Sequence, residues 1–167
     1  METLNPVIKK LTFRNKADFY QHIIKDPSFL SSIVDIHKSA ESSYFLNRNQ
    51  LYEFLISSLK DSITIFFLYH NKEPIGVMFG YHNTKSKGEF TLSSVAIKKE
   101  YQRKGFGKVF LKKAYLELEK LGYTQISLVE TTQAIKKTNE NIVSKNSKRF
   151  TKEKRNGTLI KFKSKIK

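Results

Sequence analysis

The stretch Leu92–Gly107, LSSVAIKKEYQRKGFG, carries the strongest structural signal in this chain. Its first part, Leu92 to Ile97, is an apolar run rich in β-branched residues, which is typical of a buried strand. Its last six residues, Gln102 to Gly107, contain two glycines and predict a tight turn. From Lys108 onward, apolar residues recur at helical spacing as far as Gly122, which is expected to end the helix. The stretch therefore predicts a strand, a turn and an amphipathic helix in direct succession.

The turn at Gln102 to Gly107 is the best candidate for a binding site. A glycine turn that leads into a helix leaves backbone amides unpaired, and the positive end of the helix dipole points to the same place. Phosphate groups bind at such helix N-termini, and Arg103, Lys104 and Lys108 add positive charge around this one. The pattern therefore indicates a diphosphate-binding turn. The alternative is a strand–helix connection in which the glycines only permit close packing.

Two familiar phosphate-binding motifs are excluded. The P-loop pattern G-x-x-x-x-G-K-[ST] does not occur, and the dinucleotide fingerprint G-x-G-x-x-G lacks its third glycine. The whole phrase V-A-I-x-x-E-Y-Q-x-K-G-x-G instead resembles the acetyl-CoA signature of the GNAT N-acetyltransferase superfamily, whose core motif is Q/R-x-x-G-x-G/A. Gln102, Gly105 and Gly107 stand at its fixed positions, and Glu100 and Tyr101 precede them, as is common in that family.

This resemblance implies an acyltransferase that uses acetyl-CoA as cosubstrate and needs no metal. In the family, the pantetheine arm enters between two diverging strands, expected here at Leu92 to Ile97 and Tyr123 to Val129, and the pyrophosphate binds the turn. An amine attacks the acetyl thioester directly, without a covalent enzyme intermediate. The implied cofactor-binding residues are Val95, Ala96, Ile97, Gln102, Arg103, Lys104, Gly105, Phe106, Gly107 and Lys108.

The remaining segments alternate between strands and helices separated by turn signals. Helices are expected at Asp18 to Ile24, Ser28 to Lys38, Asn49 to Lys60, Lys108 to Leu121 and Thr131 to Ser147. Strands are expected at Val7 to Arg14, Ile63 to His70, Pro74 to Tyr81, Leu92 to Ile97, Tyr123 to Val129, Phe150 to Arg155 and Thr158 to Lys163. Asn71-Lys72-Glu73 is expected to turn between two of these strands, and Asn156-Gly157 predicts a type I′ turn.

The pattern predicts an α/β fold with a mixed sheet (α+β), as a single GNAT-like domain over residues 1–167. The expected order, β-α-α-β-β-β-α-β-α-β-β, matches the GNAT layout.

Composition limits the class of protein. The 167 residues, 39% of them hydrophobic, are enough for one sizeable core. Cysteine is absent, which excludes disulfides, a thiol nucleophile and a cysteine-based zinc site. The N-terminal METLNPVIKK lacks an apolar signal core, and the apolar run Ile63 to Tyr69 is far shorter than the ~18 residues of a membrane span. A cytoplasmic protein without a membrane partner is therefore expected.

The chain is strongly basic, with a formal net charge of +16. Residues 131–167 hold twelve lysines and arginines against Glu140 and Glu153, a local net charge of +10. A concentrated basic region attracts polyanions such as tRNA. The alternative is a compositional bias toward lysine, asparagine, isoleucine and phenylalanine that has no partner behind it.

Acetyl transfer requires a neutral amine, stabilisation of the oxyanion and a proton for the departing thiolate. By family analogy, the Val95 backbone amide is the candidate for the oxyanion. Glu89, at the start of the signature strand, is the candidate for a base that acts through water. The alternative interpretation of Glu89 is a turn residue that pairs with Lys85 or Lys87.

Other polar residues give weaker indications. Ser93 and Ser94 would order a water chain or would simply be packed in the strand. Tyr81 and His82 are candidates to line a substrate site. No pair of histidines has the spacing of metal ligands, and each is expected to be structural or exposed; they are His22, His37, His70 and His82.

The general acid cannot be assigned. Many GNAT enzymes use a tyrosine in the pattern N-x-x-A-x-x-x-Y-x-x-x-G-F, on the helix after the second diverging strand. Aligning Asn139 with that asparagine puts Ile142 at the alanine position and Asn146 at the tyrosine position, and Phe150 falls one residue early. No tyrosine follows Tyr123, and asparagine cannot act as an acid near neutrality.

Three functions stay open. The first is an N-acetyltransferase acting on a primary amine of a small molecule or protein. The second is an acetyltransferase acting on aminoacyl-tRNA, as GNAT toxins do, which the basic C-terminal region favours. The third is a non-catalytic acyl-CoA-binding module, which the missing tyrosine favours. The sequence does not decide between a monomer and a homodimer.

Overall fold

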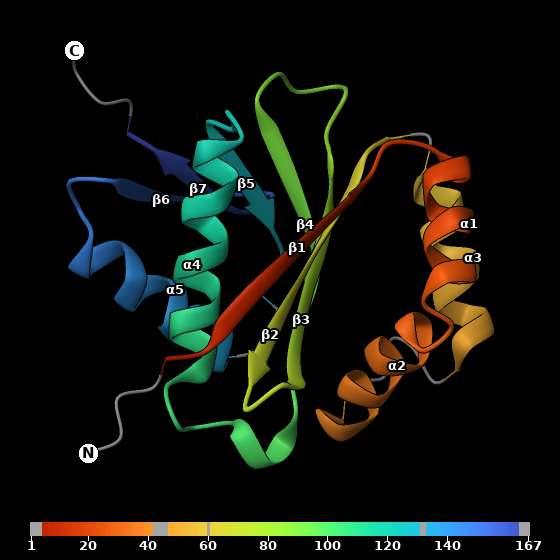
Figure 1. The fold of residues 1–167 in the computed structure, drawn as a ribbon. Helices are drawn as coiled ribbons and strands as arrows, with labels where there is room; N and C mark the ends of the chain where they lie inside the picture. The colour runs from red at the N-terminus through yellow and green to blue at the C-terminus, as the bar shows by residue number, and fades with distance from the viewer. Residues whose placement is uncertain (1–4, 42–46, 60, 131–132, 164–167) are drawn as a thin grey trace.

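The computed structural model describes residues 5–41, 47–59, 61–130 and 133–163. Within these ranges, seven strands form one mixed sheet in the spatial order β1-β2-β3-β4-β5-β7-β6 (Figure 1). The strands are β1 (Val7–Phe13), β2 (Ile63–His70), β3 (Glu73–His82), β4 (Glu89–Ile97), β5 (Gln125–Leu128), β6 (Phe150–Arg155) and β7 (Gly157–Phe162). The mixed α/β fold class expected from the sequence is confirmed.

The described helices are α1 (Lys16–Lys25), α2 (Phe29–Ser39), α3 (Arg48–Ser58), α4 (Phe106–Lys120) and α5 (Gln133–Lys145), and a short 3₁₀ helix, η1 (Lys99–Tyr101), precedes α4. Lys60 and Thr131, the expected ends of two helices, lie outside the described residues. None of the helices in the described ranges is long and apolar enough to cross a membrane.

The structure has a helix in each of the three segments between β1 and β2 where one was expected, whereas the expected order of elements has only two helices there. Asp26 ends α1, where its amide donates to the His22 carbonyl at 2.8 Å, and α2 begins only at Phe29. Proline disfavours helical backbone at the residue before it, so Asp26 cannot continue α1 into Pro27. The Asp26-Pro27 break therefore divides this segment into two helices.

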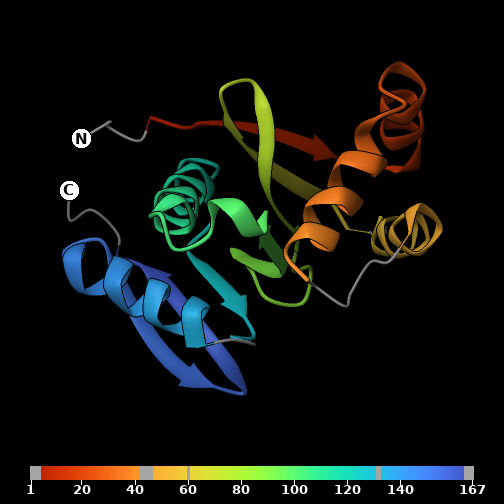
Figure 2. The same ribbon diagram turned by 90° about the horizontal axis from the view of Figure 1, so that it is seen from below.

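The sheet is buried on both faces. On β2, Ile65 and Phe67 belong to a core shared with α1, α2 and α3, whereas Phe66 and Leu68 belong to a second core shared with α4 and α5. Figures 1 and 2 show these two groups of helices on opposite sides of the sheet. Because the side chains of a strand alternate between faces, a continuous apolar run such as β2 needs cover on both sides.

Left-handed backbone at two successive turn positions occurs in the first short hairpin and not in the second, where a type I′ turn was expected. Asn71 and Lys72, between β2 and β3, have φ angles of 49° and 66°, the left-handed values that a type I′ turn requires at both positions. At the second hairpin, Arg155 pairs with Gly157, so Asn156 alone lies between paired residues. The type I′ turn predicted at Asn156-Gly157 is therefore wrong, since Gly157 already belongs to β7.

The strands β4 and β5 run parallel and pair only at their beginnings. Residues 89–91 of β4 face residues 125–127 of β5, and β4 then continues to Ile97 without β5 beside it. The register between β3 and β4 shifts next to Gly80, which leaves Ser93 as a β-bulge just beyond the paired segment. Gly80 suits this position because a Cβ there would lie 2.2 Å from the Thr91 carbonyl oxygen. The predicted divergence of the two strands is therefore present.

The bulge also changes which side chains of β4 face which helices. Before it, Phe90 and Leu92 belong to the core shared with α4. After it, Val95 and Ile97 pack against that core, and Ala96 belongs to the core shared with α1, α2 and α3. The extra residue shifts the alternation by one position, so Ser94 faces the N-terminal helices.

Candidate active site

The glycine turn has the local geometry expected of an anion site. Arg103 has φ 58° and Gly105 has φ 86°, and Gly105 caps the N-terminus of α4 without a side-chain hydrogen bond. Residues 102–105 form a turn, and within the described residues none of the close backbone hydrogen bonds outside helices and strands is donated by the amides of residues 103–108. These amides lie at the N-terminus of a fifteen-residue helix, where the helix dipole favours a negative group.

Gln102 and Gly107 shape the two ends of the turn. Gln102 Nε2 donates to the Ile97 carbonyl at 2.8 Å and so ties the turn to the end of β4. A Cβ on Gly107 would meet only Ile97 Cδ1, at 3.4 Å, so the protein itself leaves room for a side chain there. The space beside Gly107 is therefore available to a bound group. Arg103 and Lys104 are exposed next to it.

A lysine distant in sequence joins this positive region. Lys145, in the last turn of α5, lies so close to Lys108 that it lowers the pKa of the Lys108 ammonium, with smaller contributions from partial desolvation and from Lys112. Two like charges held together favour an anion between or above them, because an anion relieves their repulsion. Lys145 belongs to the basic segment of residues 131–167, and nothing in the sequence connects it with the turn.

A cavity of about 1060 Å³ lies beside the segment where β4 and β5 diverge. Its wall comes from the end of α3, the loop between β3 and β4, the bulged part of β4 and the residue after β5. The lining residues are Phe54, Ser57, Ser58, Asp61, Tyr81, Asn83, Thr84, Lys85, Thr91, Leu92, Ser93, Ser94 and Val129. Tyr81 thus lines the cavity as expected, whereas the His82 ring lies against Tyr123, with ring centroids 5.7 Å apart.

The carboxylate of Glu89, at the first residue of β4, is held at both oxygens. Asn83 Nδ2 donates to Oε1 at 2.9 Å, and Gln125 Nε2 donates to Oε2 at 2.8 Å. Partial burial by itself would raise the pKa of this carboxyl, but hydrogen bonds outweigh that effect and lower the pKa. The groups that lower it are Ser127, Asn83, Ser86 and Gln125.

Glu89 therefore joins the loop before β4 to β5 at the point where the two strands begin to diverge. Neither Lys85 nor Lys87 forms an ion pair with it within the described residues, so the pairing expected in the alternative interpretation is not formed. Glu89 lies beside the cavity, since its partner Asn83 lines the wall.

One of the four histidines lies behind the cavity wall. His37, on α2, is fully buried, and its Nε2 lies 3.2 Å from the Ser94 hydroxyl. Burial lowers the pKa of His37 to about 4. His37 is therefore buried and hydrogen-bonded, in agreement with the expectation of a structural or exposed histidine, and its partner Ser94 lines the cavity.

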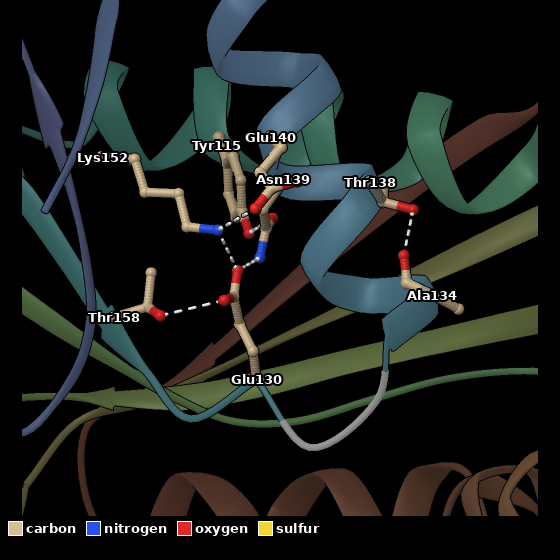
Figure 3. Close-up of polar contacts among 8 residues, drawn as sticks. All are labelled: Tyr115, Glu130, Ala134, Thr138, Asn139, Glu140, Lys152 and Thr158. Atoms are coloured by element: carbon tan, nitrogen blue, oxygen red, sulfur yellow. Dashed lines mark hydrogen bonds and ion pairs between the residues drawn. The ribbon is translucent and has the colours of Figure 1, made fainter. Parts of the chain in front are cut away.

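A polar network connects the elements on the other side of the divergence (Figure 3). Glu130, just after β5, pairs with Lys152 of β6 at 2.8 Å and accepts from Asn139 Nδ2 at 2.9 Å. The fully buried Tyr115 of α4 donates to Asn139 Oδ1 at 2.8 Å, and Thr158 of β7 donates to Glu130 at 3.1 Å. Sequence analysis had singled out Asn139 alone among these residues.

The Glu130 carboxyl stays charged inside this network. Partial burial alone would raise its pKa, but its contacts with Lys152, Asn139 and Thr158 outweigh burial and lower the pKa. Burial raises the pKa of the Tyr115 hydroxyl well above its usual range. Tyr115 therefore acts as a neutral hydrogen-bond donor, and the network holds α4, α5, β6 and β7 together.

The residue aligned with the family's tyrosine has a local structural contact. Asn146 directly follows α5, and its Nδ2 donates to the Ile142 carbonyl at 2.7 Å. Its own carbonyl accepts from the amides of Arg149 and Phe150. The side chain thus satisfies the end of its own helix, and the general acid stays unassigned.

In the described part of the chain, no three or more histidine, aspartate or glutamate side chains are grouped so that they could hold a metal ion.

Comparison with known proteins identifies the family. The model of the acetyltransferase (GNAT) family matches residues 30–137, which is more than half of the chain. No curated protein matches the sequence.

Three solved structures illustrate the shared fold. The ribosomal-protein-S18-alanine N-acetyltransferase from Escherichia coli has a TM-score of 0.59 and 18% identity over 93% of this chain and 90% of that one. The PaiA N-acetyltransferase from Thermoplasma acidophilum, in complex with coenzyme A, has a TM-score of 0.57 and 16% identity over 96% and 100%. An aminoglycoside acetyltransferase from an uncultured soil metagenomic sample, in complex with trehalose, has a TM-score of 0.56 and 14% identity over 97% of each chain. The chain therefore belongs to the acetyltransferase (GNAT) family and is an acyltransferase.

Proposed function

We propose that this protein is an N-acetyltransferase that transfers acetyl from acetyl-CoA directly to a primary amine of a small molecule or a protein. One observation carries the proposal. β4 diverges from its parallel neighbour, the turn at residues 103–108 follows it after η1 with backbone amides at the start of α4, and a cavity of about 1060 Å³ lies beside the divergence. Such a turn suits a pyrophosphate, and the divergence suits a pantetheine arm.

The cosubstrate would extend along the edge of β4. The pyrophosphate binds the amides of the turn, with Arg103, Lys104 and Lys108 as counter-charges. The pantetheine arm follows the backbone at Val95, Ala96 and Ile97. Gly107 fits this role, because among the described residues its missing Cβ would make only one ordinary contact, with Ile97 Cδ1 at 3.4 Å. The coenzyme A complex of the Thermoplasma protein supports the choice of cosubstrate.

The reaction would occur where the acetyl group meets the cavity. The amine nitrogen attacks the thioester carbonyl carbon, the carbon–sulfur bond breaks, and the thiolate takes up a proton. The Val95 amide is the proposed donor to the oxyanion, and Glu89 is the proposed base acting through water. Both roles remain predictions.

The fold leaves the acceptor open. The similar structures include an enzyme named for a ribosomal protein and one named for aminoglycosides, so the same architecture serves protein and small-molecule acceptors. The basic C-terminal region keeps aminoacyl-tRNA as a further candidate.

A thiol-release assay with acetyl-CoA tests the proposal. The panel consists of polyamines, aminoglycosides, amino acids, peptides and aminoacyl-tRNA. Release above the acceptor-free rate with at least one of them is the expected result. Tight acetyl-CoA binding without release across the panel would instead support the non-catalytic module, and the absence of both binding and release would contradict the assignment.

A further inference from the structure

The cavity wall contains a hydroxyl that is backed by a buried imidazole. His37 Nε2 lies 3.2 Å from Ser94 Oγ, and the His37 side chain is fully shielded from solvent between α2 and β4. Its ring also lies against Phe79 of β3, with centroids 6.1 Å apart. A polar group in such an apolar setting is stabilised by its hydrogen bonds, so the contact with Ser94 is not incidental.

The β-bulge explains why Ser94 reaches both the histidine and the cavity. The extra residue Ser93 shifts the alternation of β4, so Ser94 turns toward α2 and away from α4. Ser94 still lines the cavity, because the bulge lies where β4 has separated from β5. Ser94 also directly precedes Val95, whose amide is the proposed oxyanion donor.

The imidazole has a definite protonation state. Burial lowers the pKa of His37 to about 4, so the ring is neutral near pH 7. A neutral imidazole carries a hydrogen on one ring nitrogen and a lone pair on the other. A serine hydroxyl next to such a ring is held in one orientation, since it either donates to the lone pair or accepts from the N–H.

We propose that His37 is a positioning residue whose Nε2 accepts a hydrogen bond from the Ser94 hydroxyl, so that the Ser94 oxygen faces the cavity as a hydrogen-bond acceptor for the attacking amine. The proposal rests on the N-acetyltransferase activity proposed above. A neutral amine has an N–H to donate and a lone pair for the attack. Holding the N–H at Ser94, next to Val95, directs the lone pair toward the carbonyl carbon. No proton passes to His37, and the imidazole stays neutral throughout.

A double-mutant cycle tests this coupling in the full chain. The variants are Ser94→Ala, His37→Phe and the combination, measured with acetyl-CoA and the best amine from the panel. Ser94→Ala should lower kcat/KM for the amine about tenfold, the effect of one lost hydrogen bond. His37→Phe should lower it to a similar extent, and the combination should be no worse than Ser94→Ala alone, because His37 acts through Ser94. His37→Gln, which can still accept a hydrogen bond, should recover part of the loss.

Ser93 provides the matched comparison. It lies on the same cavity wall one residue earlier, and the bulge makes it exposed. The effect of Ser93→Ala on kcat/KM, whatever its size, should simply add to the effect of His37→Phe when the two substitutions are combined. Acetyl-CoA affinity, measured by calorimetry, should be unchanged in every variant. Additive effects of Ser94→Ala and His37→Phe, or equal coupling of His37 to Ser93, would overturn the proposal.

A second measurement does not depend on turnover. In the ¹⁵N-labelled protein near pH 7, the Nε2 of His37 should be the nitrogen without a proton, and Ser94→Ala should shift its resonance more than Ser93→Ala does. A protonated Nε2 would overturn the proposal even in an active enzyme. A wild-type protein that releases no thiol with any amine would contradict the proposed function instead, so the two failures are distinguishable.

Discussion

The Tyr115 hydroxyl donates to Asn139 Oδ1 at 2.8 Å, and this bond joins the helix that begins at the glycine turn to the helix that follows the second diverging strand. Asn139 in turn donates to Glu130, at the end of β5. The three side chains connect both sides of the divergence through buried polar groups (Figure 3). Because each depends on its neighbour for a partner, the network is expected to act as a unit.

Breaking the ion pair in this network should destabilise the fold. Glu130→Gln removes the charge that faces Lys152, and both side chains are largely buried, with exposures of 10% and 18%. We expect the free energy of unfolding to fall by about 3 kcal/mol, the lower end for a broken buried pair, because the Lys152 ammonium keeps only the more exposed Glu140 as counter-charge, at 3.8 Å. Urea unfolding measures this. The matched control is Glu117→Gln, which breaks the exposed pair with Lys120 and should change stability by less than about 1 kcal/mol.

Stability should fall in mild acid because of His37. Burial lowers its pKa from 6.5 to about 4, so between these pH values the unfolded chain binds a proton that the folded chain does not. The free energy of unfolding is therefore expected to decrease as the pH falls from 6.5 to 4, by about 3 kcal/mol in total from this group. Urea unfolding of wild type and His37→Gln across this range isolates the contribution. Parallel curves for the two proteins would contradict it.

Gly107 is the cleanest position at which to test acetyl-CoA binding. Gly107→Ala should fold at least as stably as wild type, since the new Cβ makes only ordinary contact with Ile97 and alanine favours helix by about 1 kcal/mol over glycine. Gly107→Asp should fold as well, because a carboxylate suits a helix N-terminus. It should also reduce acetyl-CoA affinity at least about tenfold, since the carboxylate competes for the amides and repels the pyrophosphate. Calorimetry measures the acetyl-CoA affinity and thermal melts measure the stability of each variant. Unchanged affinity in Gly107→Asp would reject the turn as the binding site.

Gly105→Pro is a poorer test of the same site, because proline cannot adopt the φ of 86° that Gly105 has, so the variant would change the turn itself.

Glu89 can be tested as a base separately from its structural contacts. If Glu89 relays a proton through water, Glu89→Gln should lower kcat roughly 10²-fold with little change in acetyl-CoA affinity. Gln125→Leu keeps the carboxylate and removes one of its hydrogen bonds, so it should lower stability more than kcat. Steady-state rates and urea unfolding of both variants separate the two roles. Wild-type kcat in Glu89→Gln would leave Glu89 with a structural role only.

The basic C-terminal region should divide into two functional parts. Lys145 lies beside Lys108 at the turn, so Lys145→Gln should weaken acetyl-CoA binding about threefold to tenfold, as the loss of one charged contact does. Lys136, Lys137 and Lys148 are exposed, and replacing all three with Gln should leave that affinity unchanged. The role of Lys136, Lys137 and Lys148 is measured by how strongly tRNA retains the protein as the salt concentration rises. If these lysines contact a polyanion, the triple variant should show a shallower salt dependence, by up to ~0.9 per contact on a duplex.

The glycine turn and its flanking elements were predictable because their causes are local. Glycine is needed where φ is positive, at Gly105, and the apolar spacing after Lys108 repeats with the period of a helix. The same local reasoning failed at Asn156-Gly157, where pairing with β7 begins one residue earlier than the turn signal indicates. The helices on either side of Asp26-Pro27 were expected at the right places, and only the expected order of elements has one helix too few there.

Contacts between distant residues could be read only from the folded chain. His37 meets Ser94 across 57 positions in the sequence, and Lys145 reaches Lys108 from another helix. Periodicity reports that a side chain is buried or exposed, but a buried histidine has no local mark that names its partner. The amino-acid order thus sufficed for the family, through its resemblance to a known motif, and for the glycine turn, whose geometry is local. The cavity wall, the imidazole behind Ser94 and the Glu130 network depend on how seven strands pair, and that pairing is settled by long-range packing.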